Sequence, residues 1–271
     1  MTSPYVLGVT GNIATGKSTV AQMLAALGAE RIDCDVLAHE AMAPGQPANA
    51  AVAARFAGVQ RADGTIDRQT LGSIVFADPR ALADLEALTH PAVLAEVARR
   101  VAASSAPVVV VEAIKLFESD LLKLCAAVWT VAATEEAQLQ RLMEYRHLEY
   151  DEAERRIAAQ PDPAEKVARA DRVIANSGSL RHTWRQVLAG WRAIPGAPQP
   201  GAHAPLPAAL RQGQAGQWRR WLLCWAALAA FCCVWTMLNW INADLTLANK
   251  VAILGAVVLV CGACSWVVLR W

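Results

Sequence analysis

The stretch that decides the fold is Gly11-Asn-Ile-Ala-Thr-Gly-Lys-Ser-Thr19, which contains the pattern GxxxxGK(S/T). It follows the apolar run Tyr5–Thr10, typical of a buried strand, and it opens the helical pattern Thr19–Leu27. In this context the pattern predicts a phosphate-binding loop, because glycines let backbone N–H groups converge on phosphate oxygens at a helix N-terminus. A chance glycine turn before a helix is the alternative. The sequence therefore predicts binding of a nucleoside triphosphate.

Every residue of this loop is a candidate ATP contact. The side chain of Lys17 should reach the β- and γ-phosphates, and the hydroxyl of Ser18 should ligate Mg²⁺. The full set of candidate ATP contacts in the loop is Gly11, Asn12, Ile13, Ala14, Thr15, Gly16, Lys17, Ser18 and Thr19.

Further strands and helices alternate along the chain. The additional strand candidates are residues 29–32, 107–111, 126–131 and 172–175. The uniformly apolar run Val108–Val111 suits a strand that is covered on both faces. This alternation predicts an α/β fold with a five-stranded parallel sheet flanked by helices. The region Ile66–Ala103 lacks strand signals and predicts a helical insertion at the carboxyl edge of the sheet, where the site should also lie.

Composition divides the chain into three regions. Residues 194–271 contain five of the 25 basic side chains and one of the 24 acidic ones, which leaves 20 basic and 23 acidic residues before Ile194. The mildly acidic front part argues against a nucleic acid partner. We predict a P-loop domain at residues 1–193, a flexible Pro-, Gly- and Ala-rich linker at 194–217 and an apolar tail at 218–271.

The tail contains two charge-free stretches, Trp221–Ile241 of 21 residues and Val251–Leu269 of 19 residues. At about 1.5 Å per residue, each can cross a hydrocarbon core of roughly 30 Å. Arg219, Arg220 and Arg270 flank the outer ends of the two stretches, and tryptophans lie near the boundaries. These features predict a transmembrane hairpin with both ends cytosolic, which would tether a cytoplasmic domain to the cell membrane. A buried helical hairpin or an oligomer interface is the alternative.

Two carboxylates end the second strand, in Ile32-Asp-Cys-Asp35. Asp33 and Asp35 should therefore lie beside the phosphate loop, where one can take the proton of an acceptor hydroxyl and the other can help to organise the magnesium shell. The alternative is that they cap the helix that begins near Val36.

Arginines recur in the helical segments after residue 135. A mobile flap built from these helices could close over the triphosphate and neutralise charge on the transferred group. Arg141 and Arg146 are the candidates, and a solvated helix face is the alternative.

Seven elements follow one another between about residue 5 and residue 192, and they are GVTGNIATGKSTVA, IDCDVLAHE, DGTIDRQTLGSIVF, the His90-Pro91 pair, EAIKLFES, the arginine-bearing lid and ADRVIANSGS. In these elements and their order the chain resembles the dephospho-CoA kinases, which implies a P-loop kinase fold with a helical substrate-binding insertion and a lid. The resemblance implies transfer of the γ-phosphate of ATP, with Mg²⁺, to the ribose 3′-hydroxyl of dephospho-CoA, which gives coenzyme A.

The resemblance also implies roles for single residues. It makes Asp35 the expected base, with Asp33 assisting the metal or the substrate. It places His90 at the start of the substrate-binding helices, against the alternative of a helix cap before Pro91. It places Asn176 on the adenine side of ATP, against the alternative of a turn asparagine.

Two features depart from the family pattern. Asn12 and Ala14 stand where the family's GGIGSGKS loop has glycines, and we expect Ala14 to keep φ below zero because its Cβ disfavours the left-handed region. The apolar tail is the second departure. Two other functions stay open at this point, namely a P-loop kinase acting on another nucleotide or a sugar acid, and a nucleotide-dependent switch that works through the tail.

Overall fold

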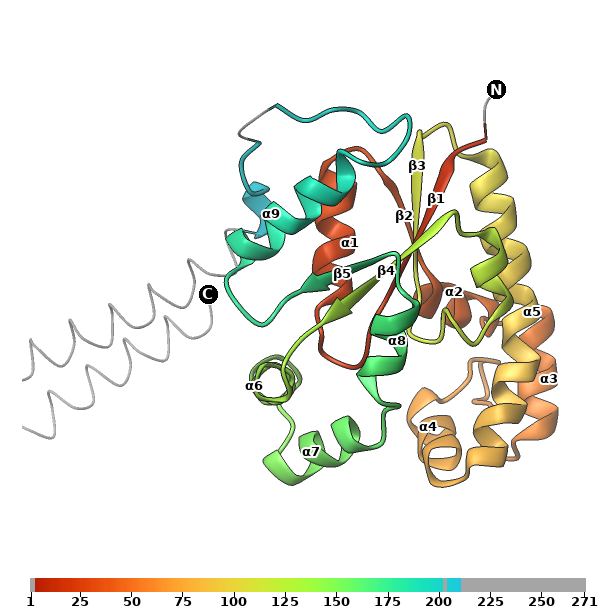
Figure 1. Ribbon diagram of the computed structural model, residues 1–271. Helices are drawn as coiled ribbons and strands as arrows, with labels where there is room; N and C mark the ends of the chain where they lie inside the picture. The colour runs from red at the N-terminus through yellow and green to blue at the C-terminus, as the bar shows by residue number, and fades with distance from the viewer. Residues whose placement is uncertain (1–2, 202–203, 211–271) are drawn as a thin grey trace, which may run out of the picture. The chain divides into compact units, whose positions relative to one another are not determined.

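A single parallel sheet forms the centre of the part of the chain that the computed structural model describes, residues 3–201 and 204–210 (Figure 1). Its strand order is β2-β3-β1-β4-β5. The strands are β1 Tyr5–Thr10, β2 Glu30–Asp33, β3 Val108–Glu112, β4 Ala127–Ala132 and β5 Arg172–Ala175. The predicted five-stranded parallel sheet is confirmed, and β2, β3 and β4 each begin one residue later than predicted.

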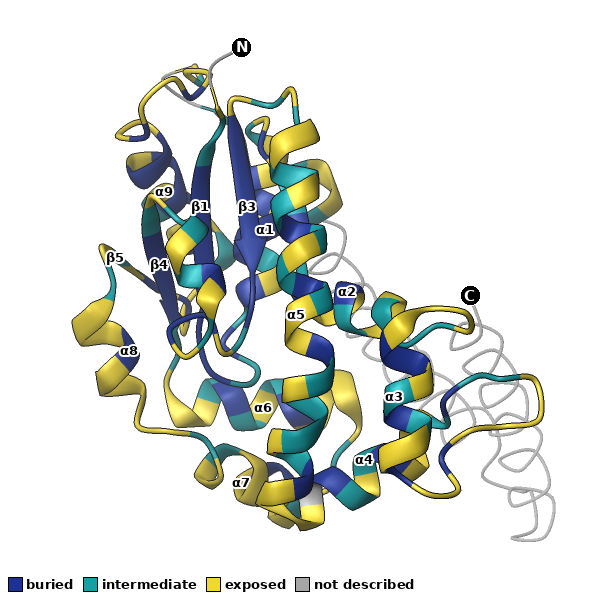
Figure 2. Cartoon of the chain, turned by 90° about the vertical axis from the view of Figure 1, so that its right-hand side faces the viewer, coloured by how far each residue is buried: buried dark blue, intermediate teal, exposed yellow. Residues whose placement is uncertain are grey.

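Helices cover both faces of this sheet, so its central strands are buried (Figure 2). Helices α1 Lys17–Ala26 and α9 Leu180–Trp191 pack together on one face. The other face carries α5 Pro79–Ala103 and the 3₁₀-helix η1 Asp120–Leu124, whose apolar side chains join one core with β3. All residues of β3 are buried, as its unbroken apolar run predicted.

A helical insertion follows β2. It comprises α2 Cys34–Ala41, α3 Pro47–Arg55, α4 Arg68–Ala77 and the first half of α5. Apolar side chains of α3, α4 and α5 form a second core of their own, which includes Val52, Phe56, Leu71 and Ala81. The helices expected between Ile66 and Ala103 are thus present, and the insertion begins earlier than that.

His90 lies in the middle of α5, so it neither begins the helical region nor caps the start of a helix, as the alternative had it. The helix starts instead at Pro79, where the Asp78 carboxylate accepts a hydrogen bond from the Arg80 N–H and proline occupies the first turn. Pro91 cannot donate a backbone hydrogen bond to the carbonyl of Ala87, yet the helix continues through it, and the following turns bury Val93 and Val97 in the core.

Three helices follow β4, namely α6 Glu135–Arg146, α7 Tyr150–Ala158 and α8 Pro163–Arg169. We call residues 135–162 the lid. Figure 1 shows α6 and α7 at the same end of the sheet as α3 and α4, beyond the carboxyl ends of the strands. The lid and the insertion therefore lie at the edge where the phosphate loop leaves β1.

Residues 194–201 and 204–207, here called the strap, pack against α1 and α9 rather than forming the start of a flexible linker. The indole N–H of Trp191 donates to the carbonyl of Pro198 at 2.7 Å, and that of Trp184 donates to the carbonyl of Ala204 at 2.9 Å. The proline-rich backbone makes few bonds of its own, so its carbonyls are available to these donors. The compact front unit accordingly extends to Pro207, beyond the predicted boundary at residue 193.

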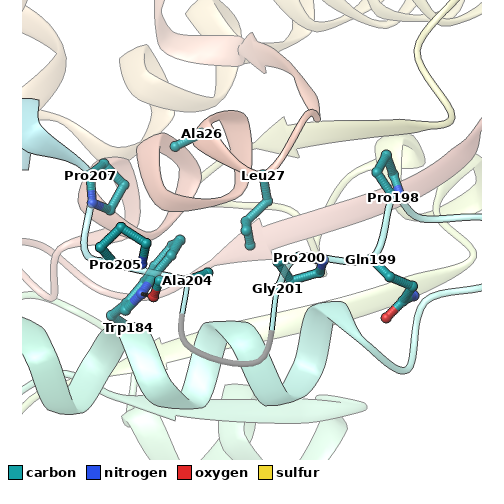
Figure 3. Close-up of a pocket in the computed structure, with 10 residues that line it drawn as sticks. All are labelled: Ala26, Leu27, Trp184, Pro198, Gln199, Pro200, Gly201, Ala204, Pro205 and Pro207. Atoms are coloured by element: carbon teal, nitrogen blue, oxygen red, sulfur yellow. Dashed lines mark hydrogen bonds between the residues drawn. The ribbon is translucent and has the colours of Figure 1, made fainter.

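The strap leaves an open pocket of about 460 Å³ between the end of α1 and Trp184 (Figure 3). Prolines line most of its strap side, and Ala26 and Leu27 line the opposite side. Within residues 3–201 and 204–210, no helix combines the length and apolar character needed to span a membrane. The predicted membrane spans, and the predicted linker beyond residue 210, lie outside the described residues.

Candidate active site

The phosphate loop joins β1 to α1 and turns through left-handed backbone. Gly11 has φ 148° and Gly16 has φ 93°, and a Cβ at Gly16 would collide with the side-chain amide of Asn176. Ala14 has φ 55°, so the expectation that it keeps φ below zero is wrong. The left-handed conformation costs roughly 1–2 kcal/mol for a residue with a Cβ, and a hydrogen bond of 3.0 Å from Arg141 to the Ala14 carbonyl helps to hold it.

Lys17, the first residue of α1, is buried and its ammonium group lies inside the loop. Its Nζ donates to the carbonyl of Asn12 at 3.3 Å. Burial lowers the pKa of Lys17 most, while the nearby carboxylates of Glu112 and Asp35 raise it and Arg146 lowers it further. The Lys17 ammonium group therefore lies in a poorly hydrated site between carboxylates, where its electrostatic attraction to a bound phosphate would be strong.

Glu112 is a site residue that the sequence reasoning did not single out. It ends β3, beside the end of β1, and is buried. Its carboxylate accepts a 2.6 Å hydrogen bond from the Ser18 hydroxyl and two hydrogen bonds, at 3.0 and 2.7 Å, from the guanidinium of Arg31. The available signal was the acidic residue that closes the apolar run Val108–Val111.

The two carboxylates after β2 have different surroundings. Asp33 is the N-cap of α2: one of its oxygens accepts from the N–H groups of Asp35 and Val36, and the other accepts from Arg31 at 2.7 Å. Asp35 lies in the first turn of α2 with an exposed side chain. Partial desolvation raises the pKa of the Asp35 carboxyl most, and the negative charge of Asp33 raises it further, while the positive charge of Lys17 lowers it.

Arg141 and Asn176 both donate hydrogen bonds to backbone carbonyls of the phosphate loop. The guanidinium of Arg141 donates to the carbonyls of Ala14 at 3.0 Å and Thr15 at 3.1 Å, and also to the carbonyl of Asn176. The Asn176 amide donates to the Thr15 carbonyl at 2.7 Å and accepts from the hydroxyl of Thr183 at 2.8 Å. Both predicted residues thus come to the loop, where they bind its backbone.

Arg146 is the last residue of α6 and is exposed, yet it lies near enough to Lys17 to lower that group's pKa. The predicted site residues that the structure brings together are therefore the loop, Asp33, Asp35, Arg141, Arg146 and Asn176. His90 stands apart: it is exposed on α5, and the described residues supply no hydrogen bond to its ring.

Oxygen ligands of the kind that Mg²⁺ prefers are present at the loop. The Ser18 hydroxyl and the Glu112 carboxylate lie together, and Mg²⁺ commonly takes only one or two protein oxygens alongside substrate phosphates. Within the described residues there is no cluster of three or more His, Cys, Asp or Glu side chains that could form an all-protein metal site. The donor set therefore fits a cation that arrives with a nucleotide.

Together, the parallel sheet, the phosphate loop, the carboxylate at the tip of β2 and the arginine-bearing lid define a P-loop small-molecule kinase. Comparison with known proteins narrows the class. Residues 5–182 match the sequence model of the family described as dephospho-CoA kinase. The chain belongs to the dephospho-CoA kinase family.

Individual relatives agree with this assignment. The dephospho-CoA kinase of Symbiobacterium thermophilum is 46% identical over 195 residues, which cover 70% of this chain and 82% of that protein. That of Geobacter metallireducens is 47% identical, covering 69% of this chain and 95% of the relative. Among solved structures, TT1252 from Thermus thermophilus matches 71% of this chain and 98% of its own, with 33% identity and a TM-score of 0.63.

Proposed function

We propose that the phosphoryl group moves in line from ATP, held on the loop Gly11–Thr19, to an acceptor hydroxyl held beside Asp35. The chain catalyses the ATP-dependent phosphorylation of dephospho-CoA to coenzyme A, the reaction of its family. Two observations support the assignment of Asp35. Its carboxylate does not cap helix α2, and it lies close enough to Lys17 for each group to shift the pKa of the other.

Asp35 acts as the general base. Its carboxylate takes the proton of the 3′-hydroxyl while that oxygen attacks the γ-phosphorus and the bond to the bridging oxygen breaks, which releases ADP. A raised pKa makes the carboxylate a better proton acceptor than an ordinary aspartate. Asp33 positions Asp35, because its cap fixes the first turn of α2.

Lys17 and the loop N–H groups hold the β- and γ-phosphates and favour the charge that develops on the transferred group. Ser18 and Glu112 would hold Mg²⁺, which supplies charge neutralisation at the same phosphates. We place the metal at Glu112 rather than at Asp33, because the Glu112 carboxylate contacts Ser18, whose hydroxyl is the other expected ligand, whereas Asp33 caps helix α2. Arg146 adds a further positive charge near the phosphates of ATP when the lid closes.

Arg141 and Asn176 keep the loop in its curved form and lie on the nucleotide side of the site. We assign them to ATP binding through this support. His90 is assigned to the acceptor-binding region on the family resemblance alone.

We also propose that the chain is tethered to the bilayer by Trp221–Ile241 and Val251–Leu269, with the kinase unit in the cytoplasm. The support is the length of the two charge-free stretches and the position of their flanking arginines and tryptophans in the sequence.

The direct test of the reaction uses the purified chain with ATP, Mg²⁺ and dephospho-CoA, and follows the product by mass. A gain of one phosphate on dephospho-CoA, with equal release of ADP, is expected. Adenosine monophosphate, shikimate and gluconate serve as rival acceptors, and faster turnover of any of these would overturn the assignment. ATP binding without transfer to any acceptor would favour the switch.

A further inference from the structure

Asn12, in the phosphate loop, makes a contact that a glycine could not make. Its side-chain N–H donates to the carbonyl of Pro161 at 2.9 Å, across 149 residues of sequence. The residue is 5% exposed, and among the described residues its Oδ1 is buried without a hydrogen-bond partner. The orientation of the amide is fixed, since turning it over would place two oxygens face to face.

Pro161 lies where the lid joins helix α8. Helix α7 ends at Ala158, and Asp162 caps the start of α8. Helix α8 is fixed to the core, because the buried Lys166 donates to the carbonyl of Ile114 at 2.9 Å and its own carbonyl accepts from Thr130 at 3.1 Å. Pro161 is therefore the carboxyl-side hinge of the lid.

The amino-side hinge is tied to the same loop. Arg141 of α6 binds the carbonyls of Ala14 and Thr15, and α6 ends at His147 in the left-handed conformation, with φ 53°. The phosphate loop therefore contacts the lid at two places, at Arg141 within α6 and, through Asn12, at Pro161 near the carboxyl end of the lid.

We propose that Asn12 is a positioning residue that couples occupation of the phosphate loop to closure of the lid, through its hydrogen bond to the Pro161 carbonyl. The Asn12 carbonyl also accepts from Lys17, so the residue that holds the hinge touches the cation that meets the γ-phosphate. When phosphate draws Lys17 away from that carbonyl, the peptide of Asn12 is free to adjust, and the hinge adjusts with it. This inference rests on the lid function proposed above.

The test uses the full chain with Asn12→Ala and Asn12→Gly. We expect kcat to fall about five- to tenfold, the size of one lost coupling hydrogen bond, and the dissociation constant for ATP to rise by a smaller factor, because the loop N–H groups remain. Amide hydrogen exchange in α7 should lose most of the slowing that a non-hydrolysable ATP analogue causes in the unaltered enzyme. Exchange in α1 should keep its slowing.

Pro161→Gly supplies the second arm. Pro161→Gly alone should lower kcat. Combined with Asn12→Ala it should lower kcat little further than Asn12→Ala alone, since both changes release the same hinge. Lys123→Ala, which removes an exposed ion pair with Asp120 in η1, is the control and should alter neither kcat nor exchange in α7.

Unchanged kcat and unchanged protection of α7 would overturn the proposal. Equal losses in kcat and ATP affinity would also overturn it, because they would indicate local damage to the loop. The role proposed for Arg146 can be rejected independently. This is the case if Arg146→Ala leaves kcat unchanged while Asn12→Ala still removes the slowing of amide exchange in α7.

Discussion

Asp33 and Asp35 are two residues apart, but they occupy different positions at the start of α2, the N-cap and the first turn. A residue at the N-cap turns its carboxylate back onto the first N–H groups of the helix, whereas a residue in the first turn points outward. The strand must end at Asp33 for this to happen. Asp33 therefore caps the helix, and the carboxylate of Asp35 remains available for the proposed role as base.

Asp35→Asn should lower kcat by about 10²-fold or more, the usual contribution of a general base. The unaltered enzyme should lose activity as pH falls, and because the pKa of Asp35 is raised this acid limb should lie at higher pH than an ordinary aspartate would give. The limb should be absent in Asp35→Asn, as pH profiles of kcat will show. Asp33→Asn is the matched control, since asparagine still caps helices; a larger rate loss there would reverse the two roles.

Glu112→Gln should raise the Mg²⁺ concentration needed for half-maximal rate by roughly 10- to 100-fold, the range found when a metal's supporting groups are removed. Glutamine keeps the size of the side chain but loses the charge beside Ser18. Titration of the rate with Mg²⁺ at saturating ATP measures the change. Glu118→Gln, at an exposed position six residues on, should leave the titration unchanged; equal curves for both variants would remove Glu112 from the metal site.

At the scale of elements, α9 and the strap stabilise α1, the helix that carries the phosphate loop at its other end. Trp191 is fully buried and its indole N–H is satisfied only by the strap carbonyl of Pro198 among the described residues. Ile194 is buried as well. The fold thus continues past the last helix of the sheet domain.

A chain that ends after Arg192 should be less stable than one that ends after Pro207. Losing the burial of Ile194 and the Trp191 hydrogen bond should cost about 2–4 kcal/mol, which lowers the melting temperature by roughly 5–15 °C for a unit of this size. Thermal unfolding of the two proteins, with and without ATP, measures this. Equal melting temperatures would show that the strap contributes nothing to stability.

At the scale of the whole molecule, the kinase unit and the tail are separable in sequence. We expect the full chain to sediment with membranes and to need detergent for release, because two charge-free stretches of 21 and 19 residues prefer hydrocarbon to water. The chain that ends after Pro207 should stay in the supernatant with unchanged kinetic constants. Release of the full chain by high salt alone would rule out a spanning hairpin.

The sequence by itself determined the sheet, the phosphate loop and the family, because each depends on local patterns. Apolar runs mark buried strands, and glycines mark the positions where backbone must approach phosphate. The tip of β2 could be placed for the same reason, and with it Asp33 and Asp35.

Only the tertiary structure decided which side chains meet. Glu112 reaches Ser18 across 94 residues, and Asn12 reaches Pro161 across 149, so neither contact leaves a local trace in the sequence. Ala14 has a left-handed φ, and distant Arg141 helps to hold it by a hydrogen bond to its carbonyl. The strap packs on α9, where two tryptophans supply donors to its carbonyls that the composition of the strap does not reveal. Local preference is worth about 1 kcal/mol per residue, and long-range packing and hydrogen bonds of equal or greater size override it.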